Sequence, residues 1–144
     1  SYNGGQLPRE EIRSILEIRG VMMDFALESA IPNMTQEQLA ELREQSEMFA
    51  RAKGAEEAAQ LIYEFDHMLS SFSDNTLLPL FFCSFKTPIK ELWRRYVTRN
   101  GVSILKHRND QLLDCIARKD VACAKRVIAD SIAETISGRT EIYG

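Results

Sequence analysis

Apolar residues recur at three- and four-residue intervals along nearly the whole chain, and this feature most constrains the fold. Such spacing places them on one face of an α-helix. The chain shows no sustained alternation of apolar and polar residues and no glycine-rich hairpin turn, so nothing predicts a β-sheet. The sequence therefore predicts an all-α protein. The first stretch shows the pattern most clearly, with a broad apolar face formed by Ile12, Ile15, Leu16, Ile18, Val21, Met22 and Phe25.

Local signals predict where the helices begin and end. Pro8 and the acidic residues after it favour a helix start. Thr35 with Gln38 three residues later is a capping-box signal, and Gly54 predicts the end of that helix. Pro88 lies inside a fourth apolar stretch and should bend or divide it. The predicted helices are residues 8–30, 32–53, 55–72, 75–97, 101–119 and 120–138.

The last predicted helix has a signal at each end, with Asp120 as N-cap and Gly138 as the stop. The connections between helices are short, so neighbouring helices should run antiparallel. The fold class we expect is an all-α antiparallel bundle of six or seven helices.

Size and charge narrow the class of protein. A chain of 144 residues with a net charge of -3 fits one soluble domain that needs no metal or disulfide to be stable. The acidic balance argues against a domain that binds nucleic acid by itself. No apolar run approaches membrane-spanning length, and no signal-peptide pattern is present. The three cysteines lack metal-ligand spacing, so we expect reduced thiols in a cytoplasmic protein.

One stretch raises the question of a metal site. Glu64 and His67 share a helix face, as in the Glu-x-x-His motif of di-iron bundles. Such bundles need the motif twice, and the other histidine, His107, has Ile104 three residues before it. No Ser-His-Asp arrangement, phosphate-binding glycine loop or CxxC pair is visible either. The sequence does not predict an enzyme.

Four polar residues interrupt apolar helix faces: Arg19, Asp66, Asn109 and Ser131. Each alone is an ordinary boundary residue, but a polar group on several helices of one bundle is what a ligand cavity requires. Asp66 should face the core and needs a partner, so it either pairs with an arginine or lines a pocket. Arginines beside aromatics in "ELWRRYV" suit carboxylate recognition, although surface ion pairs use the same residues.

Several phrases, in this order, resemble the FCD (FadR-type) C-terminal effector-binding domain of GntR-family transcription regulators. "SILEIRGVMMDFALESAI" resembles its first helix, with Arg19 at the characteristic arginine, and "MTQEQLAELREQSEMF" its second. "FDHMLSSFSDNTLL" resembles the junction before its fourth helix, and "RNDQLLDCIARKDVACAKRVIADSI" its last two helices. "SYNGG" resembles the junction that follows the winged-helix domain. The resemblance covers nearly the whole chain.

The resemblance also implies which site residues to expect. Many family members bind a divalent metal through an acid, a histidine four residues later and one histidine on each of the last two helices. Those positions fall here on Ile62, Asp66, Asn109 and Ser131. The metal site is therefore read as lost, and no cofactor is expected. The remaining cavity resembles that of the metal-free, FadR-like branch. "KTPIKELWRRYV" resembles FadR in the placing of Lys86, Arg94 and Tyr96, so Arg94 and Tyr96 join Arg19, Asp66, Asn109 and Ser131 as candidate pocket residues.

By this resemblance, residues 1–7 are a linker after a winged-helix DNA-binding domain absent from this chain, and residues 8–144 are the effector-binding and dimerisation domain. The expected partners are a small organic anionic or acyl-type effector and a second copy of the chain, with DNA reached only through the missing domain and no membrane contact. Aromatic residues of the fourth helix, Phe81, Phe82, Phe85 and Trp93, are candidates for the dimer interface. The alternatives are a metal-carboxylate bundle enzyme and a helical adaptor for a partner peptide.

Overall fold

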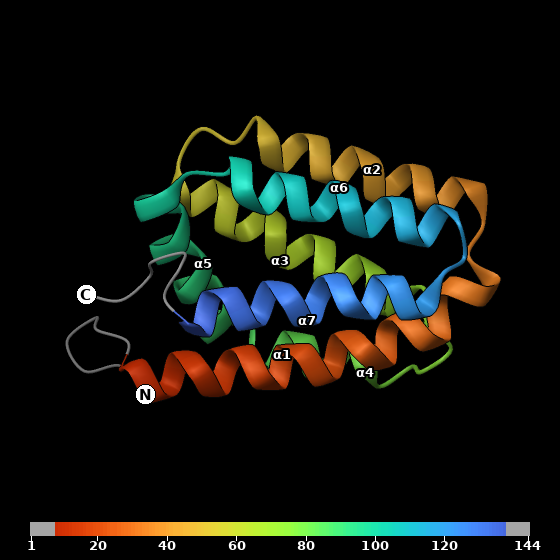
Figure 1. Ribbon diagram of the computed structural model, residues 1–144, viewed down its shortest axis with the longest axis horizontal. Helices are drawn as coiled ribbons and strands as arrows, with labels where there is room; N and C mark the ends of the chain where they lie inside the picture. Colours follow the sequence, from red (N-terminus) through yellow and green to blue (C-terminus); the bar gives the residue numbers. More distant parts are fainter. Residues whose placement is uncertain (1–7, 138–144) are drawn as a thin grey trace.

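Figure 1 shows the computed structural model of the protein, which describes residues 8–137. These residues form seven α-helices and one short 3-10 helix, with no strand among them. The predicted all-α bundle is therefore confirmed. The helices are α1 (Arg9–Ala30), α2 (Gln36–Ala50), α3 (Ala55–Ser71), α4 (Leu78–Ser84), α5 (Lys86–Asn100), α6 (Ser103–Ala117) and α7 (Val121–Ser137), and the 3-10 helix η1 is Ile31–Asn33.

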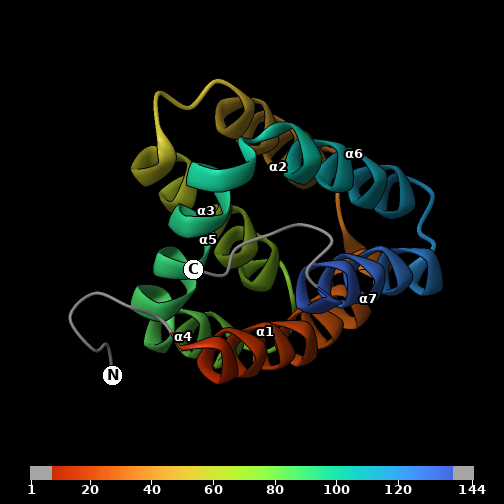
Figure 2. The same ribbon diagram turned by 60° about the vertical axis from the view of Figure 1, so that its left-hand side comes forward.

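Helix α3 occupies the middle of the bundle, where it packs against α5, α2, α4 and α1. Helix α1 lies alongside α7, and α6 packs against both α7 and α2. Figure 2 shows the α1–α7 pair on one side of the molecule and the α2–α6 pair on the other, with α3 and α5 beside them. Helices α6 and α7 run antiparallel, so the end of α6 lies beside the beginning of α7.

The helix starts follow their sequence signals. Pro8 immediately precedes α1. Thr35 caps α2, because its hydroxyl accepts a hydrogen bond from the Gln38 N–H at 3.1 Å and the Gln38 side chain accepts one from the Thr35 N–H at 3.1 Å. Asp120 precedes α7, and its carboxylate accepts a hydrogen bond from the Cys123 N–H at 3.0 Å. The three predicted N-termini are therefore confirmed.

Two predicted boundaries are displaced. The fourth stretch is divided as expected, but the break falls at Phe85, and Pro88 lies in the first turn of α5. Proline is tolerated there because a first-turn N–H has no partner within the helix. Gly54 was predicted to end the second helix, yet α2 ends at Ala50 and Gly54 directly precedes α3. Residues 1–7 and the predicted stop at Gly138 lie outside the described residues.

The core takes apolar side chains from all seven helices, and its largest fully buried members include Phe49, Phe65, Phe82, Trp93 and Tyr96. Gly20 allows α1 and α7 to approach closely. A Cβ atom at that position would lie 2.7 Å from the Ile132 Cδ1 atom. In the part of the chain that the structure describes, each helix is too short or too polar to cross a bilayer.

The expectation of reduced thiols is wrong for two of the three cysteines. Cys115 and Cys123 form a disulfide that joins the last turn of α6 to the first turn of α7, with their Cα atoms 5.6 Å apart. Spacing along the sequence did not reveal the pair, because only the tight turn between the two helices brings residues eight apart into disulfide range. Cys83 on α4 is an exposed free thiol.

Candidate functional site

An ion pair between α1 and α3 lies at the polar centre of the core. The Arg19 Nε and Nη2 atoms donate hydrogen bonds to the two carboxylate oxygens of Asp66 at 2.7 and 3.0 Å. Asp66 is completely buried and Arg19 is 6% exposed. Both side chains lie on apolar faces of their helices, which is why the fold carries them inward. This two-pronged geometry is the strongest form of an arginine–carboxylate contact.

Aromatic side chains of α5 form one wall around the arginine. The Arg19 guanidinium carbon lies 5.2 Å from the centroid of the Trp93 ring, a cation–π distance. Trp93 in turn meets Tyr96 edge to face, with ring centroids 5.7 Å apart. Trp93 is 2% exposed and Tyr96 is fully buried. The Trp93 ring is therefore in cation–π contact with the guanidinium, and Tyr96 packs against Trp93.

Several buried side-chain polar atoms, such as the Ser46 hydroxyl, have no hydrogen-bond partner among the described residues. Two of them are the Trp93 indole N–H and the Asn109 side-chain amide nitrogen. Asn109 lies on α6 and is 7% exposed. A buried donor left without an acceptor costs roughly 1–3 kcal/mol, so native proteins rarely keep one without a purpose. Both groups can only donate, so the partner they suit is an acceptor, such as a carboxylate or carbonyl oxygen.

Ser131 lies on α7 and is linked to α6 through a second buried arginine. The Ser131 hydroxyl accepts a hydrogen bond from Arg108 Nη1 at 3.0 Å, and Arg108 Nη2 donates one to Glu134 at 2.6 Å. Sequence reasoning missed Arg108, which is 9% exposed. The signal was available, because Leu105, Arg108 and Leu112 share one helix face.

A pocket of about 400 Å³ runs between α6 and α7 and reaches this arginine. Arg108, Arg126 and His107 lie among its lining residues, together with Asp130, Glu134 and the Ser131 hydroxyl. Its volume falls within the range of small-molecule sites. The mixture of cationic and hydroxyl groups is suited to a polar ligand.

Arg94, by contrast, points toward the surface. Its Nε and Nη2 atoms donate hydrogen bonds to the Glu91 carboxylate at 2.9 and 2.5 Å. This hydrogen bonding with Arg94 lowers the pKa of Glu91 despite partial burial. Arg94 lines a separate surface pocket with Lys86 and Lys90. The structure therefore brings Arg19, Asp66 and the Trp93–Tyr96 wall together, and it does not add Arg94 to them.

Glu64 and His67 on α3, the residues of the Glu-x-x-His motif, contact neighbouring side chains. The Glu64 carboxylate accepts hydrogen bonds from Gln45 at 3.2 Å and Gln60 at 2.8 Å. His67 lies beside Tyr63, with ring centroids 6.1 Å apart. Ile62 is buried in the core. Within residues 8–137, no three His, Cys, Asp or Glu side chains gather in a way that could hold a metal ion.

Residues 8–137 thus form an all-helical bundle with a buried arginine–aspartate pair in its core. Residues 14–134 match the FCD domain family, and the chain belongs to it. This family is the C-terminal effector-binding domain of GntR-family transcription regulators. No curated protein and no solved structure matches the chain. The resemblance drawn from the sequence phrases is thus confirmed for the family.

Proposed function

We propose that this domain senses a small organic acid, which it binds through the buried polar side chains Arg19, Trp93 and Asn109, with Ser131 at the side of the α6–α7 pocket. The observation that carries the proposal is the pair of buried donors, Trp93 Nε1 and Asn109 Nδ2, in a core that also holds an arginine. Donors without acceptors are complementary to an oxygen-rich ligand. The pocket between α6 and α7 supplies a route to Ser131 from outside.

The charge balance of the centre fits a ligand with one acid group. Asp66 neutralises Arg19 and uses two of the five guanidinium N–H groups, which leaves three for another acceptor. A carboxylate there would be repelled by Asp66 and attracted by Arg19. The donors of Trp93 and Asn109 that lack an acceptor favour binding of the carboxylate, because hydrogen bonds to a charged acceptor contribute about 1.5–3 kcal/mol each.

The effector prediction is tested with the double variant Arg19→Met, Asp66→Leu. Removing both partners leaves no buried unpaired charge, so the fold should survive. A thermal-shift screen of small mono- and dicarboxylic acids on the wild type first identifies the best ligand. The double variant should bind that ligand about 10–100-fold more weakly, as expected when a charge-assisted contact is lost.

The matched control is Arg94→Ala, which removes a surface arginine of the neighbouring pocket and should leave the affinity within about twofold, a change of less than 0.5 kcal/mol. Unchanged binding in the folded double variant would show that the Arg19–Asp66 pair is only structural. Loss of binding in Arg94→Ala instead would move the site to the surface pocket.

We also expect the purified domain to contain no stoichiometric zinc, nickel or manganese. The family's metal positions are occupied by Ile62, Asp66, Asn109 and Ser131, and isoleucine, amide and hydroxyl side chains are poor replacements for an acid and imidazoles. Elemental analysis after dialysis against each metal measures this directly. One bound metal per chain that disappears in Asp66→Ala would contradict the assignment.

The proposed regulator acts as a homodimer, and an exposed apolar surface on two adjacent helices supports this. On α1 the exposed residues are Ile18, Val21 and Phe25, and at α4 they are Leu80 and Phe81 together with Leu77, which immediately precedes the helix. Helices α1 and α4 pack against one another. Isolated exposed apolar residues are common, but two stripes on neighbouring helices are typical of an interaction surface. Phe82 and Trp93, which the sequence also suggested for an interface, are buried in the core.

Replacing Phe81 by Asp should convert the dimer to a monomer, because it places a charge in a dehydrated apolar contact. Light scattering at roughly tens of micromolar, a regime suited to a weak dimer, reports the mass. Met48 on α2 is also exposed, so Met48→Asp is the matched control and should remain dimeric. A wild-type monomer, or a dimer unaffected by Phe81→Asp, would rule out this face.

Effector binding would then act by population shift. Two tethered DNA-binding domains read two half-sites in matched twofold symmetry, so their relative pose decides DNA affinity. A ligand that binds one pose of the dimer better shifts the equilibrium toward it by its difference in affinity. No chemistry on the ligand is required.

A further inference from the structure

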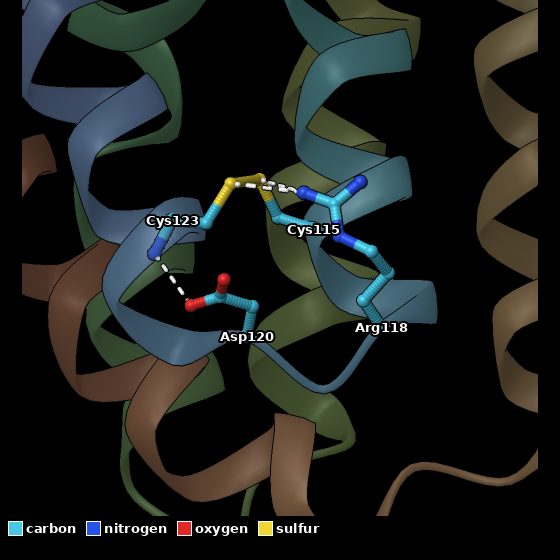
Figure 3. Close-up of a disulfide and its surroundings, with 4 residues drawn as sticks. All are labelled: Cys115, Arg118, Asp120 and Cys123. Atoms are coloured by element: carbon cyan, nitrogen blue, oxygen red, sulfur yellow. Dashed lines mark hydrogen bonds between the residues drawn. A yellow bond between two sulfur atoms is a disulfide. The ribbon is translucent and has the colours of Figure 1, made fainter.

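The disulfide between α6 and α7 lies at one end of the pocket that also contains Ser131. Cys123 lines that pocket and is half-buried, whereas Cys115 is only 2% exposed. The Arg118 guanidinium lies against both sulfurs, with Nη2 3.4 Å from Cys123 Sγ and 4.0 Å from Cys115 Sγ (Figure 3). One sulfur is therefore accessible from solvent, and a positive charge stands beside the bond.

The turn that carries the two cysteines is held by hydrogen bonds of its own. The Asp120 N–H donates to the Cys115 carbonyl at 3.0 Å and the Lys119 N–H to the Ile116 carbonyl at 2.9 Å, the pattern of a Schellman motif. The Asp120 carboxylate accepts a hydrogen bond from the Cys123 N–H (Figure 3). Opening the disulfide removes none of these bonds. The two thiols would stay within reach of each other, which favours rapid re-formation.

The surroundings of Cys123 also suit thiolate chemistry. Cys123 lies in the first turn of α7, where unpaired N–H groups favour negative charge. Arg118 adds a full positive charge next to the same sulfur. Cysteines at helix N-termini beside arginine are the reactive ones in thiol–disulfide exchange. The Asp120 carboxylate opposes this effect, but it is engaged by the backbone N–H of Cys123.

We propose that Cys115 and Cys123 form a reversible thiol–disulfide exchange site that reacts with low-molecular-weight thiols and disulfides. In the reducing direction an external thiolate attacks the accessible Cys123 sulfur, forms a mixed disulfide and releases Cys115 as a thiolate that takes up a proton. A second external thiol attacks the mixed disulfide, restores the Cys123 thiol and leaves as the oxidised small disulfide. The net reaction consumes two thiols and transfers two electrons and two protons to the protein.

The exchange has a structural consequence for the pocket, and this part rests on the proposed effector site. The disulfide joins α6 and α7 at one end of the pocket, and the contact from Arg108 to Ser131 joins them about two helical turns away. Closing the bond fixes the separation of the helices along this length. Reduction leaves only hydrogen bonds and packing to hold it, so the oxidation state sets how freely the pocket can open.

The experiment uses the whole chain and does not depend on any effector. The protein is equilibrated in mixtures of reduced and oxidised glutathione, alkylated and analysed by peptide mass spectrometry. Cys115 and Cys123 should gain the alkyl label together in one transition within the range of these mixtures. The exposed Cys83 serves as an internal control for labelling, and a Cys83→Ser variant excludes bonds between chains.

Two further measurements test the consequence. Reduction of the wild type should lower the melting temperature by about 5–10 °C, the size expected for opening a short disulfide loop. Hydrogen exchange should speed up in the α6–α7 turn and the start of α7, and stay unchanged in α2 and α3. Cys115→Ser should match the reduced wild type in both measurements and should not respond to glutathione.

If Cys115 and Cys123 stay unlabelled in every glutathione mixture, their disulfide is a structural bond. If both are labelled in every mixture, the disulfide does not form under these conditions. Either result overturns the proposal, as does hydrogen exchange that is the same in both states. These readouts are independent of ligand binding. Failure of the effector screen with a normal redox transition would refute only the proposed function.

Discussion

Replacing Asp66 by Ala should lower the free energy of unfolding by about 3–5 kcal/mol, the loss typical of breaking a buried ion pair by removing one partner. The variant leaves the Arg19 guanidinium buried without its carboxylate, in a site where the arginine is only 6% exposed. A guanidinium stays charged in proteins, so the buried charge must find another partner or water. The helix must therefore shift to hydrate the charge. Urea denaturation followed by circular dichroism measures the change.

The control is Glu91→Ala, which breaks the Arg94–Glu91 pair near the surface together with the longer contact from Arg95 to the same carboxylate. That pair has side chains 39% and 21% exposed, so its loss should cost no more than about 1 kcal/mol. The double variant Arg19→Met, Asp66→Leu should recover most of the stability lost in Asp66→Ala, because apolar replacement of both partners is often neutral. If Asp66→Ala is no less stable than Glu91→Ala, water reaches the polar centre and the pair is not desolvated.

Sequence reasoning located this ion pair only in part. The position of Asp66 on the face of Ile62 and Leu69 indicated burial, and burial required a partner or a wet cavity. The structure shows that Arg19 is the partner, although the two residues are 47 positions apart. Periodicity reports which way a side chain faces within its own helix, whereas the choice of partner depends on how α1 and α3 pack. The sequence therefore predicted two buried polar residues and left their pairing as one of the alternatives.

Other features could not be predicted from the sequence, because they arise from the packing of the helices. The disulfide depends on a tight turn between α6 and α7, in which Lys119 adopts a left-handed conformation with φ 59°. The sequence has no glycine at that position to signal such a turn. The resemblance pointed to Asn109, a family position, and not to Arg108 beside it. Arg94, like Arg19, was a candidate pocket residue, yet its neighbour Glu91 at i−3 pairs with it on the outside of α5.

The boundary errors have a similar origin. Proline was expected to break the fourth stretch where it stands, but Pro88 is compatible with the first turn of a helix, so the chain breaks earlier, at Phe85. On α4, Phe82 is buried and Phe81 is exposed. Counting aromatics therefore identified α4 as a candidate interface without showing which of its faces is free.

Two substitutions of Trp93 should separate its contribution to stability from its contribution to ligand binding. Trp93→Ala should cost about 3–5 kcal/mol of unfolding free energy, because it empties a fully packed site against Arg19 and Tyr96. Trp93→Phe keeps an aromatic ring beside the arginine and removes only the indole N–H and part of the volume. It also removes a buried donor without an acceptor, which offsets some of the packing loss. We expect it to cost about 1–2 kcal/mol.

For binding, Trp93→Phe should weaken the best carboxylate ligand about 10–100-fold, the value of one hydrogen bond to a charged acceptor of roughly 1.5–3 kcal/mol. Calorimetric titration of folded Trp93→Phe measures this, and urea denaturation of the same sample confirms that it is folded. Unchanged affinity in Trp93→Phe would mean that the indole N–H does not meet the ligand, and the effector would then have to be held by Arg19 and Asn109 alone. A loss much larger than about 100-fold would mean that the ring also sets the arginine's position, which the single N–H cannot explain.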